Sequence, residues 1–194
     1  MISIQEKPDK VSWEEIRNVV YEAHASNRAK GVDIRNAHLL GDQMKQSIGE
    51  DGVCFIALDG NKVVATSSIA FHHLNTWYAC RQKVAYSTLQ AVLPEYKGNH
   101  LFSKLEKEGI ECAHKSSCTG IYKKVAEKNF LMRSIAKKDG YFEVSIARTS
   151  YNPHNYITLF KWFGCRPYSR LYIRLRYLLS WTKLKFNIAL GRVK

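Results

Sequence analysis

Residues 96–100, Tyr-Lys-Gly-Asn-His, place a cation, a glycine and polar side chains in one short turn. Residues 84–93 before the turn are mostly apolar or β-branched and predict a buried strand, and apolar residues recur at helical spacing from Leu101 onward. The first N–H groups of a helix have no intrahelical partner, and the helix dipole favours an anion beside them. This strand–turn–helix pattern predicts a phosphate-binding site, to which Lys97 adds a full positive charge.

Two sequence blocks resemble one enzyme family. Residues 92–101 follow the pattern V-x-P-x-Y-K-G-x-x-L, which resembles the acyl-CoA signature V-x-P-x-Y-R-G-x-G-x-G of the GNAT N-acetyltransferase superfamily. Residues 129–141, NFLMRSIAKKDGY, resemble that family's block N-x-x-A-x-x-L-Y-x-K-x-G-F. The sequence departs from the family at three positions, because His100 and Phe102 replace glycines and Ala136 replaces a tyrosine.

The resemblance implies an N-acetyltransferase that uses acetyl-CoA as its acyl donor. In the family the pantetheine arm pairs with the backbone of the fourth strand, which falls on Gln90, Ala91 and Val92, and an amide near Val92 is the expected oxyanion donor. Asn129 is predicted to cap the helix that it precedes, either as a cap alone or as a cap that also touches the pantetheine. The pyrophosphate would lie on the turn formed by Lys97, Gly98, Asn99, His100, Leu101 and Phe102.

The acid–base chemistry is less complete than the cofactor site. Tyr86 matches a position at which several family members carry a base glutamate, but a phenol with a pKa near 10 is a poor base at neutral pH. Tyr86 is therefore predicted either to relay a proton through water, to orient the amine, or only to line the site. Ala136 cannot protonate the leaving thiolate. In the turn, we expect His100 to adopt an ordinary right-handed backbone conformation without strain. The adjacent His72 and His73 should face opposite ways on a strand, so no metal site is expected.

The elements around these motifs predict an α+β (mixed) fold, and the resemblance implies that it is of the GNAT type. On that basis we expect six or seven mostly antiparallel strands, a central V-shaped splay with one parallel pair, and flanking helices. Ser12 and Glu15 have the spacing of a capping box at the start of the first helix. The predicted helices cover residues 12–26, 38–48, 98–115 and 129–138. The predicted strands cover 2–5, 53–58, 62–71, 82–93, 121–127, 142–149 and 156–163, with a turn at 150–154 between the last two.

The composition narrows the class of protein. The chain has 194 residues, 45% of them hydrophobic, which suits one globular domain; we place it at residues 1–163. The first ten residues lack an apolar stretch, and the five cysteines form no C-x-x-C pair, so we expect no signal peptide, reduced thiols and a cytoplasmic location.

The acceptor is expected to be a small-molecule amine, a sugar amine or a peptide amine. A homodimer is left open, and a non-catalytic protein that binds acyl-CoA or an anionic surface is the alternative to the enzyme.

Residues 164–194 are predicted to form a basic amphipathic C-terminal extension. The net charge is +13, and the segment 144–194 holds ten Lys and Arg residues and no Asp or Glu. Ile173, Tyr177, Trp181 and Leu184 recur at helical spacing, which favours a helix over a strand. Such a helix suits peripheral association with an anionic membrane, and the alternative is a helix packed on its own domain. Nucleic-acid binding is not expected, because the aromatic residues also suit an apolar helix face.

Overall fold

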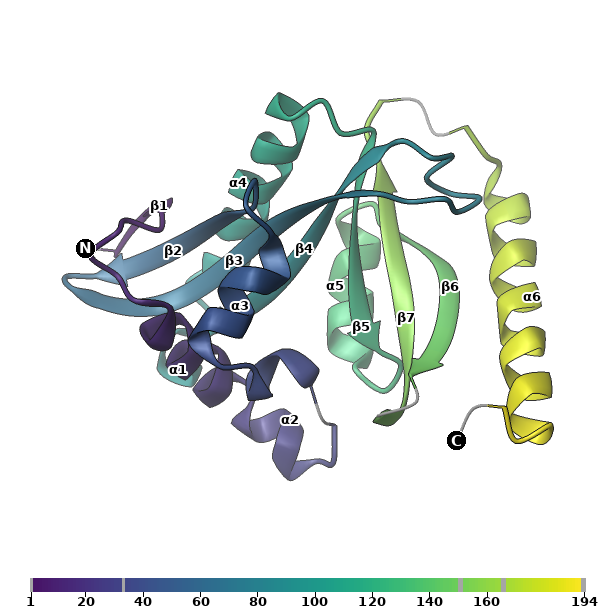
Figure 1. The fold of residues 1–194 in the computed structure, drawn as a ribbon, viewed down its shortest axis with the longest axis horizontal. Helices are drawn as coiled ribbons and strands as arrows, with labels where there is room; N and C mark the ends of the chain where they lie inside the picture. The colour runs from purple at the N-terminus through teal and green to yellow at the C-terminus, as the bar shows by residue number, and fades with distance from the viewer. Residues whose placement is uncertain (1, 33, 150–151, 165–166, 193–194) are drawn as a thin grey trace.

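The computed structural model describes residues 2–32, 34–149, 152–164 and 167–192, and in these residues a seven-stranded sheet runs through the molecule in the order β1-β2-β3-β4-β5-β7-β6 (Figure 1). The strands are β1 (Ile2–Glu6), β2 (Val53–Asp59), β3 (Lys62–His73), β4 (Lys83–Val92), β5 (Gly120–Ala126), β6 (Phe142–Thr149) and β7 (Asn152–Trp162). The helices are α1 (Trp13–Ala23), α2 (Ala25–Ala29), α3 (Gly41–Ile48), α4 (Leu101–Lys115), α5 (Phe130–Lys138) and α6 (Arg170–Ala189), with 3-10 turns η1 (Arg35–His38) and η2 (Pro94–Tyr96).

The sheet is antiparallel except at its centre, where β4 and β5 run parallel. These two strands pair only at Ala85 with Ile121 and at Tyr86 with Tyr122. Beyond this short contact they separate, and Figure 1 shows β2, β3 and β4 turning away from β5, β7 and β6. The predicted fold class is therefore confirmed, including the central splay.

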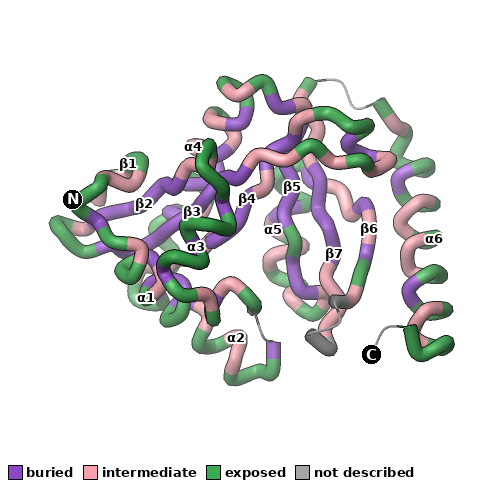
Figure 2. Tube along the Cα trace, in the orientation of Figure 1, coloured by how far each residue is buried: buried purple, intermediate pink, exposed green. Residues whose placement is uncertain are grey.

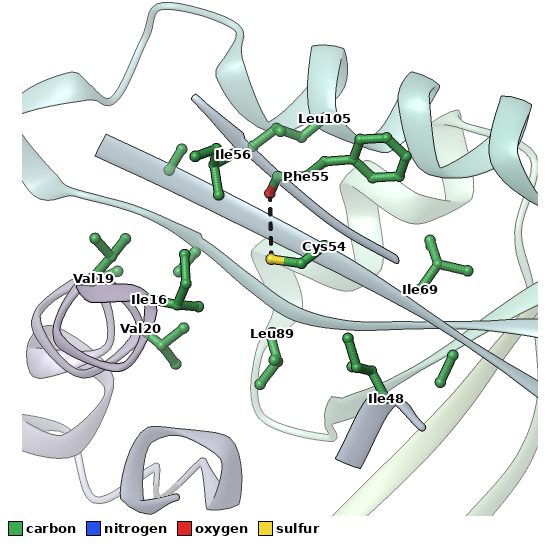
Figure 3. Packing of buried hydrophobic residues seen from close by; sticks show 14 of the residues in the cluster. Ile16, Val19, Val20, Ile48, Cys54, Phe55, Ile56, Ile69, Leu89 and Leu105 are labelled. Carbon is green, nitrogen blue, oxygen red and sulfur yellow. Dashed lines mark hydrogen bonds between the residues drawn. The ribbon is translucent and has the colours of Figure 1, made fainter. Parts of the chain in front are cut away.

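The hydrophobic core joins the β1–β4 half of the sheet to helices on both of its faces. Helices α1 and α3 pack on β3 from one face, and α4 packs on β2, β3 and β4 from the other. Ile16 and Val20 of α1 are fully buried, as are Ile56 of β2 and Ile69 of β3. Figure 3 shows Leu105 of α4 near Ile56 on one side of the strands and Ile16 and Val20 of α1 on the other, so apolar side chains pack on both faces of this half of the sheet.

Several local predictions are confirmed. The capping box is present, since the Glu15 N–H donates to Ser12 Oγ over 3.1 Å and the Ser12 N–H donates to Glu15 Oε2 over 2.7 Å. The hairpin between β2 and β3 turns at Gly60, whose φ is 59°.

Several predicted boundaries are wrong. The first helix, predicted over 12–26, ends at Ala23, and the short helix α2 follows it. The second helix begins at Gly41 instead of residue 38, because residues 35–38 form a 3-10 turn and the Gly41 N–H donates to Glu14 Oε1 over 2.9 Å. A Cβ at Gly41 would lie 2.8 Å from the same oxygen, so glycine allows this close approach. Strand β7 begins at residue 152 instead of 156, and helix α4 begins at 101 instead of 98. Part of the predicted 150–154 turn, residues 150 and 151, lies outside the described residues.

The C-terminal helix α6 lies beside β6 at the edge of the sheet (Figures 1 and 2). Its Ile173 and Leu184 are buried, and Tyr177 and Trp181 pack against the core. The helical prediction is thus confirmed, and the helix is docked on its own domain. Among the described residues, no helix is both long and apolar enough to span a membrane.

Candidate active site

A cleft of about 830 Å³ opens where β4 and β5 separate. Its walls come from the end of β4, the turn before α4, the end of β5, the start of α5 and the α1–α2 segment. The lining includes almost every residue predicted from the two motifs: Tyr86, Gln90, Ala91, Val92, Lys97, Gly98, His100, Leu101, Phe102 and Asn129. The exception is Asn99, whose exposed side chain donates to the carbonyl of Tyr96 over 3.2 Å.

One wall of the cleft is the free edge of β4. Ala91 and Val92 pair with Thr66 and Ala65 of β3, whereas the pairing with β5 ends at Tyr86. The register of β3 and β4 shifts between Thr66 and Ser68, and Leu89 of β4 has a φ of 49°. Bulges of this kind bend a strand and alter the direction of its edge. The backbone beyond Tyr86 therefore faces the cleft without a strand partner from β5.

The turn before α4 forms a second wall, and here one prediction is wrong. His100, the N-cap of α4, has φ 56° and ψ 18°, which is left-handed and not right-handed. The family's glycine adopts such a conformation freely, whereas a side chain costs about 1–2 kcal/mol there. His100 makes no side-chain capping bond, so the first amides of α4 are not capped by this residue. Lys97 is exposed beside them.

Contacts from the β2–β3 hairpin hold this turn in place. The Tyr96 hydroxyl donates to Asp59 Oδ2 over 3.0 Å, and Lys62 pairs with Glu95 at 3.0 Å. These two contacts tie the segment just before His100 to the hairpin. The start of α4 follows this segment and lines the cleft through Leu101 and Phe102.

The second sequence block divides between the cleft and the core. Asn129 is the N-cap of α5, as predicted, since its side chain accepts from the Met132 N–H over 3.2 Å, and it also lines the cleft. Ala136, at the family's tyrosine position, is 2% exposed and packs in the core. The neighbouring Ile135 lines the cleft instead. The chain therefore carries no hydroxyl at this point of α5.

Tyr86 belongs to an aromatic stack that the sequence did not reveal. Its ring stacks on Tyr122 with centroids 4.7 Å apart and on His72 with centroids 5.6 Å apart. Burial raises the pKa of Tyr122, so its phenol stays protonated, and its hydroxyl is hydrogen-bonded to His72 Nδ1 over 2.7 Å. Burial, with a smaller effect of Lys124, lowers the pKa of His72. The neutral form of the His72 imidazole is therefore favoured at neutral pH.

The α1–α2 wall contributes polar groups that also escaped notice in the sequence. His24 lies in the cleft, where Asn27 Nδ2 is 3.1 Å from its Nδ1. Burial lowers the pKa of His24 to about 4, although a hydrogen bond to the Gln90 backbone partly opposes this shift. Asn36 donates to Thr88 Oγ1 over 2.9 Å. The sequence carries one signal for His24, because it follows the buried Ile16 and Val20 at intervals of four residues, which is the spacing of one helix face.

A buried ionic network bridges the splay on the α4 side. Lys123 of β5 pairs with Glu106 of α4 at 2.8 Å, and both side chains are about 5% exposed or less. Gln90 of β4 donates to Glu106 over 2.6 Å, and the Tyr141 hydroxyl also donates to this carboxylate. Burial alone would raise the pKa of Glu106, but the charge of Lys123 and these hydrogen bonds hold it below its usual value. The network joins β4 to β5 where backbone pairing has ended.

Comparisons with known proteins agree with this architecture. No family model and no curated protein matches the sequence. Among solved structures, a GNAT-family acetyltransferase from Staphylococcus aureus Mu50 is similar with a TM-score of 0.64 and 14% identity, covering 84% of this chain and 100% of the other. The ribosomal-protein-S18-alanine N-acetyltransferase from Escherichia coli has a TM-score of 0.62 and 15% identity, covering 87% and 99%. A structure of the NatC complex bound to Gag peptide and CoA is similar with a TM-score of 0.63 and 12% identity, covering 84% of this chain and 99% of the other.

At these identities the similarity establishes the fold, and the chain has the fold of the GNAT acetyltransferases. The resemblance found in the two motifs is thereby confirmed at the level of architecture. The cleft lies between the separating central strands, and one of the similar structures is a complex that contains CoA and a peptide.

Proposed function

We propose that this protein is an N-acetyltransferase that transfers the acetyl group of acetyl-CoA to a primary amine. The observation that carries the proposal is one continuous cleft, which runs from the start of α4 past the free edge of β4 to the α1–α2 wall. A donor held at the α4 end and an acceptor held at the α1–α2 end would meet beside β4. Bringing two reactants together in this way supplies much of the acceleration for acyl transfer.

The residues of the cleft suit CoA. Phosphates would lie at the first amides of α4, where the dipole and Lys97 both favour an anion. A pantetheine arm would pair with the β4 edge at Gln90, Ala91 and Val92, and an amide there would stabilise the negative oxygen as the amine attacks. The Gln90 side chain is held by Glu106, which leaves the strand edge clear. Gly98, Asn99, His100, Leu101, Phe102 and Asn129 complete the proposed donor site.

Tyr86 is proposed to orient the acceptor amine, with the neutral His72 behind it. The amine must lose a proton as its nitrogen bonds to the acyl carbon and the thiolate leaves. A protonated phenol donates a hydrogen bond and does not take this proton, so water is its first acceptor. Tyr86→Phe should therefore raise KM for the amine more than it lowers kcat. A fall in kcat alone, with loss of the rise in kcat with pH, would instead make Tyr86 the acceptor of this proton.

The charge of the cleft narrows the acceptor. None of the described residues that line it is Asp or Glu, whereas Lys30, Lys124 and Lys128 are present. Lys124 projects to the same sheet face as Tyr122, because Lys123 between them points to Glu106. A polycationic acceptor would be repelled there, and a nearby positive charge also favours the neutral form of an amine. We therefore propose an amine without further positive charge, such as an amino sugar or its phosphate ester, or a neutral or acidic peptide.

The first experiment is a thermal shift with acetyl-CoA, followed by release of free thiol with a panel of amines. Acetyl-CoA at about one hundred times Kd should stabilise the fold by ~2.7 kcal/mol. Matched acceptors would be an amino sugar, its phosphate ester and a polyamine, each tested with the wild type and with Lys124→Gln. Absence of any shift refutes donor binding, whereas a shift without turnover of any amine refutes the transferase. Preference for the polyamine would refute only the acceptor assignment.

A further inference from the structure

The outermost helix of the molecule, α6, has two apolar stripes, and only one of them is used for packing. Ile173 and Leu184 are 3% and 5% exposed and face β6. Leu175, Leu178 and Leu179 are 51%, 51% and 61% exposed. At about 100° per residue, these leucines lie roughly opposite the packed stripe. We call this second set the outer stripe: Leu171, Leu175, Leu178, Leu179 and Phe186.

The inward stripe fixes the rotation of the helix. Ser180 Oγ accepts from the Ile146 N–H of the edge strand β6 over 3.1 Å, so α6 satisfies and covers this edge. Before the helix begins, the Tyr168 hydroxyl donates to the Trp77 carbonyl over 2.8 Å. Arg176 lies 5.5 Å from the centre of the Trp77 ring. These contacts hold the outer stripe toward solvent, and Figure 1 shows α6 at the margin of the molecule beside β6.

Cations border the outer stripe on both sides. By the same helical geometry Arg174 and Lys185 flank one side, and Arg176 and Lys183 flank the other. No acidic residue follows Glu143 in the sequence, and Glu143 itself is paired with Arg133 at 2.8 Å. The outer stripe is thus bordered by cations, and α6 itself contains no Asp or Glu.

We propose that α6 binds the surface of an anionic membrane through its outer stripe. An apolar stripe bordered by Lys and Arg matches an interface in which acyl chains lie beneath negative headgroups. A second copy of the same chain would bring like charges together around the stripe, which disfavours self-association there. The protein would lie on the membrane with α6 at the interface, and this assignment does not depend on the reaction proposed for the cleft.

The test is co-sedimentation of the full chain with vesicles, because removal of α6 would uncover β6. Binding is expected to vesicles of phosphatidylcholine mixed with phosphatidylglycerol and not to phosphatidylcholine alone, and it should weaken with salt. Leu178→Gln should lower partitioning roughly tenfold through lost apolar burial. Leu40→Gln is the matched control, since Leu40 is 54% exposed on another part of the surface, and it should leave partitioning unchanged.

The charge contribution is tested separately with Arg174→Gln/Lys183→Gln, which should weaken binding by about fivefold per cation. The control is Lys10→Gln/Lys45→Gln, which removes two exposed cations, one just before α1 and one on α3, and Figure 1 shows both helices on the other side of the molecule from α6. Equal losses in both double variants would indicate a response to net charge alone and would overturn the proposal. Unchanged partitioning of Leu178→Gln would overturn it as well. A dimer in light scattering that Leu178→Gln converts to a monomer would also overturn it, because the outer stripe would then be a self-interface.

Discussion

The buried pair of Lys123 and Glu106 should dominate the stability of the cleft. At 2.8 Å, and with an effective dielectric constant of about 20, the gross attraction between the two charges is ~6 kcal/mol. Desolvation of both ions offsets much of this attraction. Removal of one partner, however, leaves the other charge buried and unpaired, which typically costs about 3–5 kcal/mol. We therefore expect Lys123→Met to lower the free energy of unfolding by roughly this amount.

The assay is a double-mutant cycle measured by urea unfolding. Glu106→Gln should cost a similar amount, because it leaves the ammonium of Lys123 without its counter-ion. The double variant should be more stable than the sum of the two losses predicts, by about 2 kcal/mol or more, since no unpaired charge then remains. In a chain of this size a loss of 3–5 kcal/mol lowers Tm by ~10 °C. Lys107→Met is the control, because its 3.8 Å pair with Glu111 is largely exposed.

The pH dependence provides an independent check of the same pair. The pKa of Glu106 is lower in the folded state than its ordinary value of 4.5. The unfolded chain therefore takes up the proton first as the pH falls, and the contribution of Glu106 is complete above about pH 4.5 and declines below it. Two results together would refute the network: each single variant loses less than ~1 kcal/mol and the losses simply add in the double variant, and Glu106→Gln unfolds in acid at the same pH as the wild type.

Three further outcomes test the cleft. Lys97→Glu should weaken acetyl-CoA binding roughly tenfold and reduce its dependence on salt, while the unfolding midpoint stays constant; an unchanged Kd would place the phosphates elsewhere. Because burial lowers the pKa of His24 to about 4, folded-state stability should fall by ~3 kcal/mol as the pH drops from 6.5 toward 4, and His24→Gln should remove this dependence in acid unfolding curves. His100→Gly should stabilise the chain by ~0.5–1 kcal/mol by relieving the left-handed conformation, whereas His100→Ala should not; equal effects would show that the backbone there is unstrained.

The local motifs were visible in the sequence because their chemistry is local. Ser12 and Glu15 cap a helix three residues apart, and Lys97 and Gly98 stand between a strand and a helix whatever the remaining chain does. The apolar runs also predicted the sheet and its helices, since burial of each run requires a covered face. The role of each cofactor residue stays a prediction, although the structure brings nearly all of them to one cleft.

What the sequence could not decide depends on contacts between distant segments. The sequence does not show which way the side chains of Tyr122 and Tyr141 point. In the structure, Tyr122 is hydrogen-bonded to His72, and Tyr141 is hydrogen-bonded to Glu106 on the other side of the splay. The conformation of His100 was predicted wrongly, because its φ of 56° departs from what a residue with a side chain prefers and belongs to the turn into α4. In α6 the sequence determined a basic helix with many apolar residues. Only the packing on β6 decided which apolar stripe is buried and which faces outward, because both stripes repeat with the same helical period.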